Sequence, residues 1–309
     1  MDDNELTLSG HGCRHPPFQN ILFMQPERFG EYTLHERLNE GGTAEVFFAT
    51  NSRGEGVALR RLRPDYKFSL SKRSGFRHGM EIQMQMNGPH VVHVFELQTR
   101  KMVPYAVMEY IDGVNLRQAL LRRDEFLPHW TNAFALFEGI AKGLGEIHHR
   151  GSMHLDMKPE NVMLNRAGEV KILDFDLARR ISKQPVALSS VDGTPSYLAP
   201  ELILREPVDE RTDIFSLGIL GYELFTGQKP FTAPTHQELF RAYTTRNVAF
   251  PPPVKLDPSL PQTLNDIILH CIEKKFELRY PAVALILRDL RKVKLPATSS
   301  TPEHSGNSP

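Results

Sequence analysis

Cysteine is scarce in this sequence, and neither sign of charge is in excess. Two cysteines, Cys13 and Cys271, occur among 309 residues, too few for a disulfide framework, and this favours a reducing compartment such as the cytosol. Lysine plus arginine and aspartate plus glutamate both total 37, so the formal net charge is zero. That balance removes the electrostatic argument for nucleic acid or an anionic membrane as the main partner.

Long apolar runs are also missing. No segment has the length of a membrane span, the best candidate being the interrupted run IFSLGILGYELF. The first residues are acidic and polar, so no secretory signal is predicted. We therefore expect a soluble, cytoplasmic protein. With 309 residues, 40% of them apolar, the chain is long enough for one large domain or two lobes with a sizeable core.

The two ends of the chain differ in composition from the part between them. Residues 1–29 lack periodicity, and residues 293–309 are rich in serine, threonine and proline, so both are predicted to be disordered tails. His11, Cys13 and His15 alternate in the first tail, but no second cluster completes a metal site. We read them as solvated side chains.

Between the tails the apolar pattern changes once, near residue 104. Residues 30–108 contain β-like runs such as EVFFAT, GVALRRL and HVVHVFEL, interrupted by one helical candidate, SGFRHGMEIQMQM. In residues 112–292, long segments with apolar spacing of three and four predict helices. We find no internal repeat. The pattern predicts a small sheet with one helix, followed by a larger helical lobe.

The stretch HLDMKPENVMLNRAGEVKILDFD, residues 154–176, concentrates residues suited to magnesium and polyphosphate. Asp156 and Lys158 are followed by Asn161 and Asp174. Carboxylate and amide oxygens are hard ligands that Mg2+ prefers, and a lysine can neutralise phosphate charge. The pattern predicts metal and phosphate binding, which is not yet catalysis.

HLDMKPENVML resembles the catalytic loop of eukaryotic-type protein kinases, and DFD stands where that family has DFG. Other motifs resemble the family in the same order: the glycine-rich loop LNEGGTAEV, the hinge AVMEYIDG with Met108 as gatekeeper, and GTPSYLAPE with DERTDIFSLG. A lone GG is usually a turn and a lone HxD usually surface chemistry, whereas an ordered series of such motifs is specific. The resemblance covers about residues 30–292.

The resemblance implies a two-lobed α+β kinase fold, with a small antiparallel sheet and one helix in residues 30–108 and a helical lobe in residues 112–292. It implies ATP and Mg2+ or Mn2+ as cofactors, and a protein substrate with a serine or threonine acceptor. Asp156 would orient the acceptor hydroxyl and take its proton, and Lys158 would neutralise the transferred phosphoryl group. Asn161 and Asp174 would hold the metal. The nucleotide would contact Asn39, Gly41, Gly42, Val46, Ala58, Arg60, Glu109, Ile111 and Met163, with backbone groups of Glu109 and Ile111 at the adenine edge.

Structural roles follow from the same resemblance. Arg279, in ELRYPA, stands where the family's arginine pairs with the glutamate of APE, here Glu201. Asp213 is expected to hold the backbone of the catalytic loop. Three histidines are read as packing residues: His148, His149 and His154. The basic run over residues 60–77 is read as a solvated face, with a docking surface as the second reading.

The sequence departs from the family at the phosphate-binding positions. Arg60, in VALRRL, replaces the strand lysine that contacts the α and β phosphates. Gly79 lies ten residues before Pro89, where the family has its helix glutamate. Glu81 is two positions farther on, about 200° around a helix, and should point elsewhere. The ion pair typical of active kinases therefore cannot form in the usual way.

Two further replacements concern control. Leu155 replaces the arginine of HRD, which in many kinases pairs with a phosphorylated activation segment, so switching through that contact is not expected. Asp176 replaces the glycine of DFG, which adds a carboxylate near the metal and removes a flexible hinge. The candidate phosphorylation sites are Ser182, Ser189, Ser190 and Thr194.

Two functions remain open. Losing one preorganised contact costs about 10² to 10³ in rate, whereas enzymes accelerate by roughly 10⁶ or more, so a serine/threonine kinase of low activity is compatible with Arg60. The rival is a pseudokinase that binds nucleotide or serves as a scaffold, which Arg60, Gly79 and Asp176 favour. A small-molecule phosphotransferase fits KPEN and GTPSYLAPE less well. Changing Arg60 to lysine together with Gly79 to glutamate should raise turnover, unless Arg60 is paired with Asp174 or Asp176.

Overall fold

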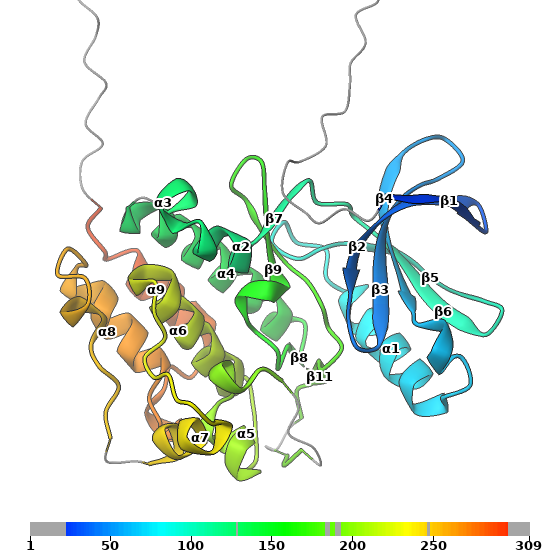
Figure 1. The fold of residues 1–309 in the computed structure, drawn as a ribbon. Helices are drawn as coiled ribbons and strands as arrows, with labels where there is room; N and C mark the ends of the chain where they lie inside the picture. The colour runs from blue at the N-terminus through cyan, green and yellow to red at the C-terminus, as the bar shows by residue number, and fades with distance from the viewer. Residues whose placement is uncertain (1–22, 128, 183–185, 189–192, 246–247, 296–309) are drawn as a thin grey trace, which may run out of the picture.

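The computed structural model describes residues 23–127, 129–182, 186–188, 193–245 and 248–295. It has two lobes, with the sheet of the first beside the helices of the second (Figure 1). This confirms the predicted α+β arrangement. Most of both predicted tails, including His11, Cys13 and His15, lies outside the described residues.

The amino-terminal lobe contains a six-stranded antiparallel sheet with the strand order β1-β2-β3-β4-β6-β5. Its strands are β1 (Phe23–Phe29), β2 (Tyr32–Glu40), β3 (Ala44–Thr50), β4 (Gly56–Leu62), β5 (Val94–Arg100) and β6 (Val103–Met108). Along β4, Val57 and Leu59 pack into one buried cluster, while Ala58 and Leu62 pack into another on the opposite face. Both faces of β4 are therefore covered, which explains its nearly continuous apolar run.

The predicted lobe boundary at residue 30 is too late by one strand. β1 pairs with β2, with Phe29 opposite Tyr32. Pro26 argues against a strand when the sequence is read alone, because proline has no N–H to donate to a neighbouring strand. However, β1 is at the edge of the sheet, where proline is tolerated. The run HVVHVFEL is likewise not one strand, because Val91 forms an isolated bridge with Ile172 and β5 begins at Val94.

The one helix of this lobe, α1 (Leu70–Gln83), begins four residues before the predicted segment 74–86. Ser69 sets this start, since its side chain accepts a hydrogen bond from the Lys72 N–H. Phe76 and Met80 of α1 join the same buried cluster as Ala58 and Leu62. The helix therefore covers the face of β4 from which Arg60 also projects.

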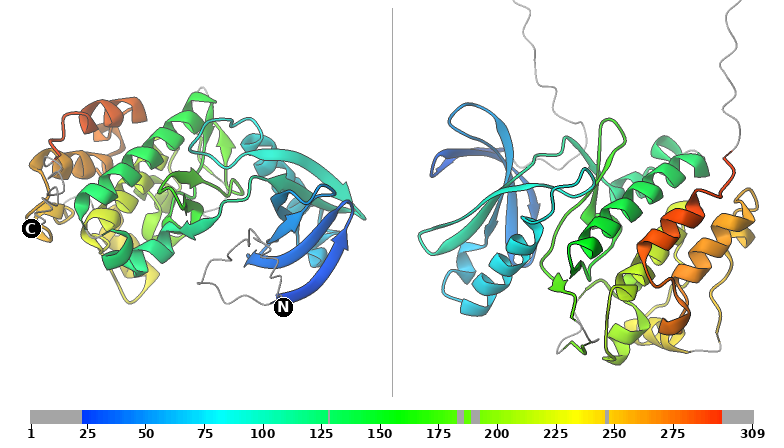
Figure 2. Two further views of the ribbon diagram at one scale, coloured as in Figure 1. Left: turned by 90° about the horizontal axis from the view of Figure 1, so that it is seen from above. Right: turned by 180° about the vertical axis from the view of Figure 1, so that it is seen from behind.

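The carboxyl-terminal lobe is mainly helical. Its helices are α2 (Leu116–Leu121), α3 (Arg123–Phe126), α4 (Trp130–His149), α5 (Pro200–Leu204), α6 (Arg211–Thr226), α7 (His236–Thr244), α8 (Gln262–Cys271) and α9 (Val283–Leu290). Helix α6 is buried on all sides, as expected of a central helix. Helix α9 lies along α4 at the back of this lobe (Figure 2).

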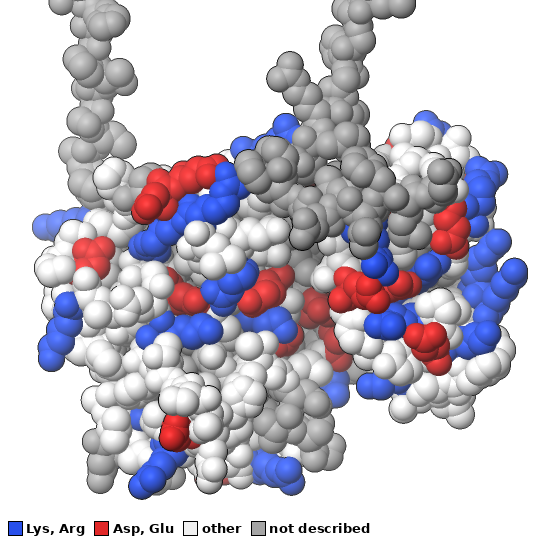
Figure 3. All heavy atoms as spheres, viewed as in Figure 1, with Lys and Arg blue, Asp and Glu red and all other residues white. Residues whose placement is uncertain are grey.

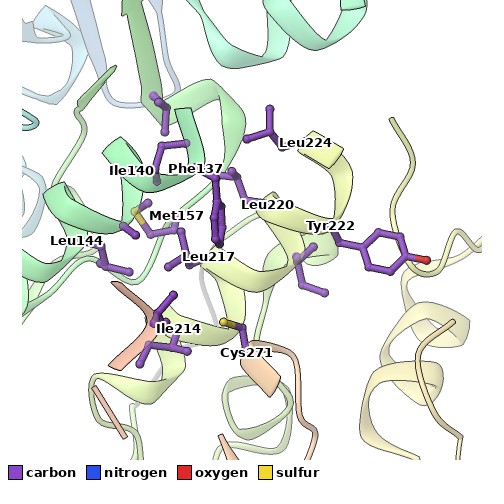
Figure 4. Packing of buried hydrophobic residues seen from close by; sticks show 14 of the residues in the cluster. Phe137, Ile140, Leu144, Met157, Ile214, Leu217, Leu220, Tyr222, Leu224 and Cys271 are labelled. Atoms are coloured by element: carbon purple, nitrogen blue, oxygen red, sulfur yellow. The ribbon is translucent and has the colours of Figure 1, made fainter. Parts of the chain in front are cut away.

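Helices α4 and α6 form the centre of the largest buried cluster. Figure 4 shows apolar side chains from both helices and from the residues that flank them, among them Phe137, Ile140, Leu144, Met157, Ile214, Leu217 and Leu220. Cys271, a free thiol, is buried in the same cluster, and burial raises its pKa. This thiol acts as a small apolar side chain.

Two small sheets place the loops that carry the motifs. One joins β7 (Gly113–Asn115), β9 (Val162–Asn165) and β10 (Val170–Ile172), and the other joins β8 (Ser152–Met153) to β11 (Arg179–Arg180). The stretch HLDMKPEN runs between β8 and β9, and DFD follows β10. Both loops therefore face the first lobe.

Acidic and basic side chains are interspersed over both lobes on the face shown in Figure 3. Among the described residues, no helix has the length and apolar character that crossing a bilayer requires.

Candidate active site

A cavity of about 940 Å³ lies between the lobes. The structure brings almost all of the predicted site residues to its wall, which contains Asn39, Gly41, Gly42, Val46, Ala58, Arg60, Glu109, Ile111, Lys158, Asn161, Met163 and Asp174. Asp156 is not part of the wall, but it contacts Lys158 and Asn161 directly. The motifs thus converge on one space although they lie more than a hundred residues apart in sequence.

One part of the wall is apolar and has side chains from both lobes. Val46 and Ala58 come from the sheet, Met163 and Leu173 come from the helical lobe, and Met108 is buried behind them. The Glu109 N–H donates to the His93 carbonyl at 2.9 Å. Only the carbonyl of Glu109 is therefore left to face an adenine edge.

The glycine-rich loop is the turn between β2 and β3. Asn39 still pairs with Val46 in the ladder, so the position where the family has its first glycine is an ordinary strand residue here. The Gly41 N–H donates to the Ala44 carbonyl at 2.9 Å, and a Cβ added to Gly42 would meet nothing within 4 Å. The turn is closed by the backbone, and its tip is open.

The catalytic loop is held together by Asp156. Its Oδ2 accepts hydrogen bonds from Lys158 Nζ at 2.6 Å and from Asn161 Nδ2 at 2.9 Å. Asn161 Nδ2 also donates to the Asp156 carbonyl at 2.9 Å. Because the amide nitrogen is used in this way, Asn161 Oδ1 is the atom left for a metal ion, and the role of Asn161 as a metal ligand stays a prediction.

The buried side chain of Asp213 holds the backbone of the catalytic loop. Its carboxylate accepts the backbone N–H groups of His154 at 2.8 Å and Leu155 at 2.7 Å, which confirms the predicted role. Leu155 has φ +62, a conformation that needs such support. Burial would raise the pKa of Asp213, but the hydrogen bond with His148, at 2.9 Å, helps to hold that pKa below its usual value.

The three histidines have different roles. His154 is fully buried, with its ring centroid 4.9 Å from that of Phe175, which confirms its packing role. His148 is a partner of Asp213 as well as a packing residue. The prediction was wrong for His149, because this side chain is exposed at the end of α4.

Arg60 is 7% exposed, so the prediction that places it in a solvated basic face is wrong. It lies on an inner strand, beneath α1, with its guanidinium 5.7 Å from the Phe76 ring centroid. Its Nη2 donates to Asp174 Oδ1 at 3.0 Å and to Asp176 Oδ2 at 2.7 Å. The alternative in which Arg60 pairs with these aspartates is therefore confirmed.

The two aspartates have opposite pKa shifts. Burial would raise the pKa of Asp174, but the positive charge of Arg60 more than offsets it, so the pKa lies below its usual value. For Asp176, burial and the charge of Asp174 outweigh the attraction of Arg60, so its pKa is raised. One guanidinium between two carboxylates leaves an excess of negative charge, which suits a further cation.

The residues present fit a divalent ion bound together with phosphates. Asp176 Oδ1 is buried and has no hydrogen-bond partner among the described residues, and Asn161 lines the same cavity. The described residues contain no group of three His, Cys, Asp or Glu side chains placed to hold a metal. Mg2+ is usually held by one or two protein oxygens plus substrate phosphates, so a smaller donor set is sufficient.

Gly79 is at the closest approach of α1 to DFD. A Cβ at this position would lie 2.6 Å from the Phe175 carbonyl oxygen and 3.3 Å from the Asp176 Cα. Glutamate therefore does not fit without displacing this backbone, which favours the alternative in which Gly79→Glu does not rescue activity. Glu81 is exposed and pairs with Arg77 at 3.7 Å, so it points away from the site as predicted.

Several residues of the cavity wall were not assigned to the site from the sequence, among them Gln83, Thr43 and Thr194. Gln83 is 1% exposed, donates through Nε2 to the Val92 carbonyl at 2.9 Å, and leaves Oε1 without a partner among the described residues. It lies four residues after Gly79, and this spacing could have identified it, because such residues share a helix face. Thr43 and Thr194 also line the cavity, and both lie in motifs that the sequence analysis quoted without assigning these two side chains to the site.

The segment after DFD is anchored by a buried ion pair. Arg279 contacts Glu201 through two hydrogen bonds, of 2.6 and 2.7 Å, which confirms the predicted pair. Thr212 donates to the same carboxylate at 2.8 Å. Of the candidate phosphorylation sites, Ser182 is exposed and Thr194 half-buried, whereas Ser189 and Ser190 lie outside the described residues.

Comparison with known proteins agrees with this geometry. The family described as "Protein kinase domain" matches residues 32–289. A probable serine/threonine-protein kinase of Streptomyces coelicolor is 35% identical over 265 residues, which cover 83% of this chain and 39% of that protein. Serine/threonine-protein kinase PknB of Mycobacterium tuberculosis is 32% identical over 270 residues, which cover 85% of this chain and 42% of the relative. The chain thus spans well under half the length of these relatives.

Proposed function

Because the chain belongs to the protein kinase family, we propose that it transfers the γ-phosphoryl group of ATP to serine or threonine hydroxyls of a protein, at a modest rate. The family, together with relatives named as serine/threonine-protein kinases, supports the reaction class. The observation that carries the proposal is the hydrogen-bonded arrangement of Asp156, Lys158 and Asn161 at the cavity.

This arrangement leaves one oxygen of Asp156 for the acceptor. Both side-chain hydrogen bonds use Oδ2, and Oδ1 lies on the side of Gly193, the first residue of GTPSY. An acceptor hydroxyl placed there would donate to Oδ1, be oriented by it, and transfer its proton to it as the new bond to phosphorus forms. Lys158, beside the same carboxylate, can neutralise charge on the transferred group.

ATP would bind with its adenine in the apolar part of the cavity and its phosphates toward Arg60. Asn161 and Asp174 would hold the divalent ion, which would neutralise phosphate charge when bound. The Gly41 N–H already donates to the Ala44 carbonyl, so Gly42, at the open tip of the β2–β3 turn, is the glycine that phosphate oxygens would approach.

A second candidate is a pseudokinase that binds nucleotide, or a scaffold that does not. One observation favours it: Asp174, the proposed metal ligand, is already bonded to Arg60. A metal must replace that bond, which lowers the apparent affinity for metal. We favour the kinase, because Asp156, Lys158 and Asn161 are in place and only the phosphate contact is altered.

The test is transfer from labelled ATP with Mg2+ or Mn2+, with and without a basic protein substrate. Asp156→Asn should lower the rate by about 10² to 10⁴, since the hydroxyl loses its base. Asp65→Asn is the matched control, because Asp65 is 73% exposed and should keep the native rate. Undiminished transfer by Asp156→Asn would show that the activity comes from a contaminant or another group.

Calorimetry separates the two candidates. Binding of ATP should release more heat with a divalent ion than without one, if Asn161 and Asp174 hold that ion. Metal-dependent binding without transfer would support the pseudokinase. No metal-dependent heat at millimolar nucleotide would refute the proposed nucleotide site.

A further inference from the structure

A buried guanidinium that contacts phosphates needs a fixed counter-charge, because its side chain is otherwise free to adopt other rotamers. Arg60 has two such partners, Asp174 at 3.0 Å and Asp176 at 2.7 Å. Both bonds use the same nitrogen, Nη2, so Nη1 and Nε take no part in them. These other donors are therefore the ones that can meet phosphate oxygens.

The two aspartates cannot have equal roles once a nucleotide is bound. Asp174 is the proposed metal ligand, and a divalent ion on its carboxylate competes with the bond to Arg60. The proposed metal ligands are Asn161 and Asp174, whereas Asp176 makes the shorter contact with Arg60 through its Oδ2, which leaves only its Oδ1 for a cation. It is the partner that can stay on Arg60 through the reaction.

Helix α1 offers no competing partner. Glu81 is its single acidic residue, and that side chain is exposed and paired with Arg77. Gly79 is against the Phe175 carbonyl, with no room for a carboxylate. The counter-charge of Arg60 must come from another element.

Asp176 is well placed to supply it. Among the described residues, the non-glycine positions with positive φ include Asp174 but not Asp176, so aspartate in place of glycine causes no backbone strain here. Its Oδ2 also accepts a hydrogen bond from Thr43 Oγ1, at 3.5 Å, in the glycine-rich turn. One carboxylate thus connects β4, the β2–β3 turn and the DFD segment, all of which line the cavity.

We propose that Asp176 is the positioning residue that holds Arg60 toward the nucleotide phosphates, in the role that a helix carboxylate has in the family. This inference rests on the proposed nucleotide site. It has a counter-intuitive consequence: restoring the family's glycine with Asp176→Gly should weaken the phosphate contact, although it makes the motif more typical.

The test compares ATP with adenosine, which lacks phosphates, by calorimetry on the native chain and on Asp176→Asn. Losing a hydrogen bond to a charged group should weaken ATP binding about 10-fold to 100-fold. Adenosine affinity should not change, because the apolar part of the cavity is untouched. Equal losses for both ligands would mean that Asp176 only supports the fold, and unchanged ATP binding would also overturn the proposal.

Two further variants keep the result specific. Asp176→Glu retains the carboxylate and should recover part of the ATP affinity, whereas Glu81→Gln, on α1, should leave it at the native value. If Asp176 acts through Arg60, Arg60→Met combined with Asp176→Asn should bind ATP no more weakly than Arg60→Met alone. Additive losses in the double variant would contradict the proposal. If this pattern holds without phosphoryl transfer, Asp176 keeps its role and only the kinase proposal fails.

Discussion

The close contact between α1 and DFD predicts opposite effects of one substitution at two positions of the same helix. Gly75 and Gly79 both lie in α1. A Cβ at Gly75 would meet nothing within 4 Å, whereas a Cβ at Gly79 would lie 2.6 Å from the Phe175 carbonyl oxygen. Alanine gains the same helix propensity at both, about 1 kcal/mol. The difference between the two variants therefore measures the packing term alone.

That packing term can be estimated from the atoms involved. The neighbours of Gly79 are backbone atoms of Phe175 and Asp176, which cannot rotate away as a side-chain tip can. Inserting a methyl group into such a site costs about 1 to 3 kcal/mol. Gly75→Ala should thus raise the free energy of unfolding by about 0.5 to 1 kcal/mol. Gly79→Ala should be less stable than Gly75→Ala by about 1 to 3 kcal/mol.

Urea unfolding followed by circular dichroism can measure this difference. The comparison requires similar m-values, because only then do the midpoints report stability. ATP affinity of the folded variants gives an independent reading, since a displaced DFD segment would also move Asp174 and Asp176. If Gly79→Ala proves as stable as Gly75→Ala and binds ATP normally, α1 does not pack against DFD as closely as described.

Three other changes probe neighbouring parts of the site. Arg60→Lys should weaken ATP binding, since an ammonium lacks the planar guanidinium that reaches the aspartates and the phosphates together. Adding Gly79→Glu should not restore the affinity. Calorimetry on the native chain, the two single variants and the double variant measures both effects. Arg279→Met should cost about 3 to 5 kcal/mol in urea unfolding, because it leaves Glu201 buried without its cation. The pKa of Asp213 is lowered in the folded protein, so its ionised carboxylate stabilises the fold above the usual carboxyl pKa of 3.8, and this contribution is lost as the pH falls below that value. The free energy of unfolding of Asp213→Asn, measured in urea at several acidic pH values, should therefore depend less on pH than that of the native chain.

The sequence could predict the site because its motifs are local. Asp156, Lys158 and Asn161 lie within six residues of one another, and their hydrogen bonds form inside a single loop. The strand GVALRRL is predicted with its full bounds, since a short run that contains adjacent apolar residues is itself a strand signal. Where local chemistry determined the structure, reading the residues was sufficient.

Non-local contacts explain what the sequence could not predict. Arg60 belongs to a basic run, and only the fold shows that β4 is an inner strand with α1 over it. Strand β1 contains Pro26 and is defined by its partner β2 rather than by its own pattern. From the sequence alone, Gly79 is only a position where the family's glutamate is missing. In the fold, it packs against the backbone carbonyl of Phe175, which is almost a hundred residues away in the sequence.

The three departures from the family therefore form one arrangement. The family places one cation on the strand, one carboxylate on the helix and one in DFG. Here Arg60 keeps the cation, Asp174 keeps the carboxylate of DFG, and the second carboxylate is that of Asp176 instead of a side chain at the position of Gly79. The number of charges at the phosphate site is unchanged, and the loss of the helix side chain makes room for α1 against DFD. If the chain had lost its function, substitutions at these charged positions would be expected to be independent of one another. A carboxylate that has changed position but still pairs with Arg60 instead keeps the cation fixed for a phosphate contact. This is the physical reason to favour slow phosphoryl transfer over a scaffold without it.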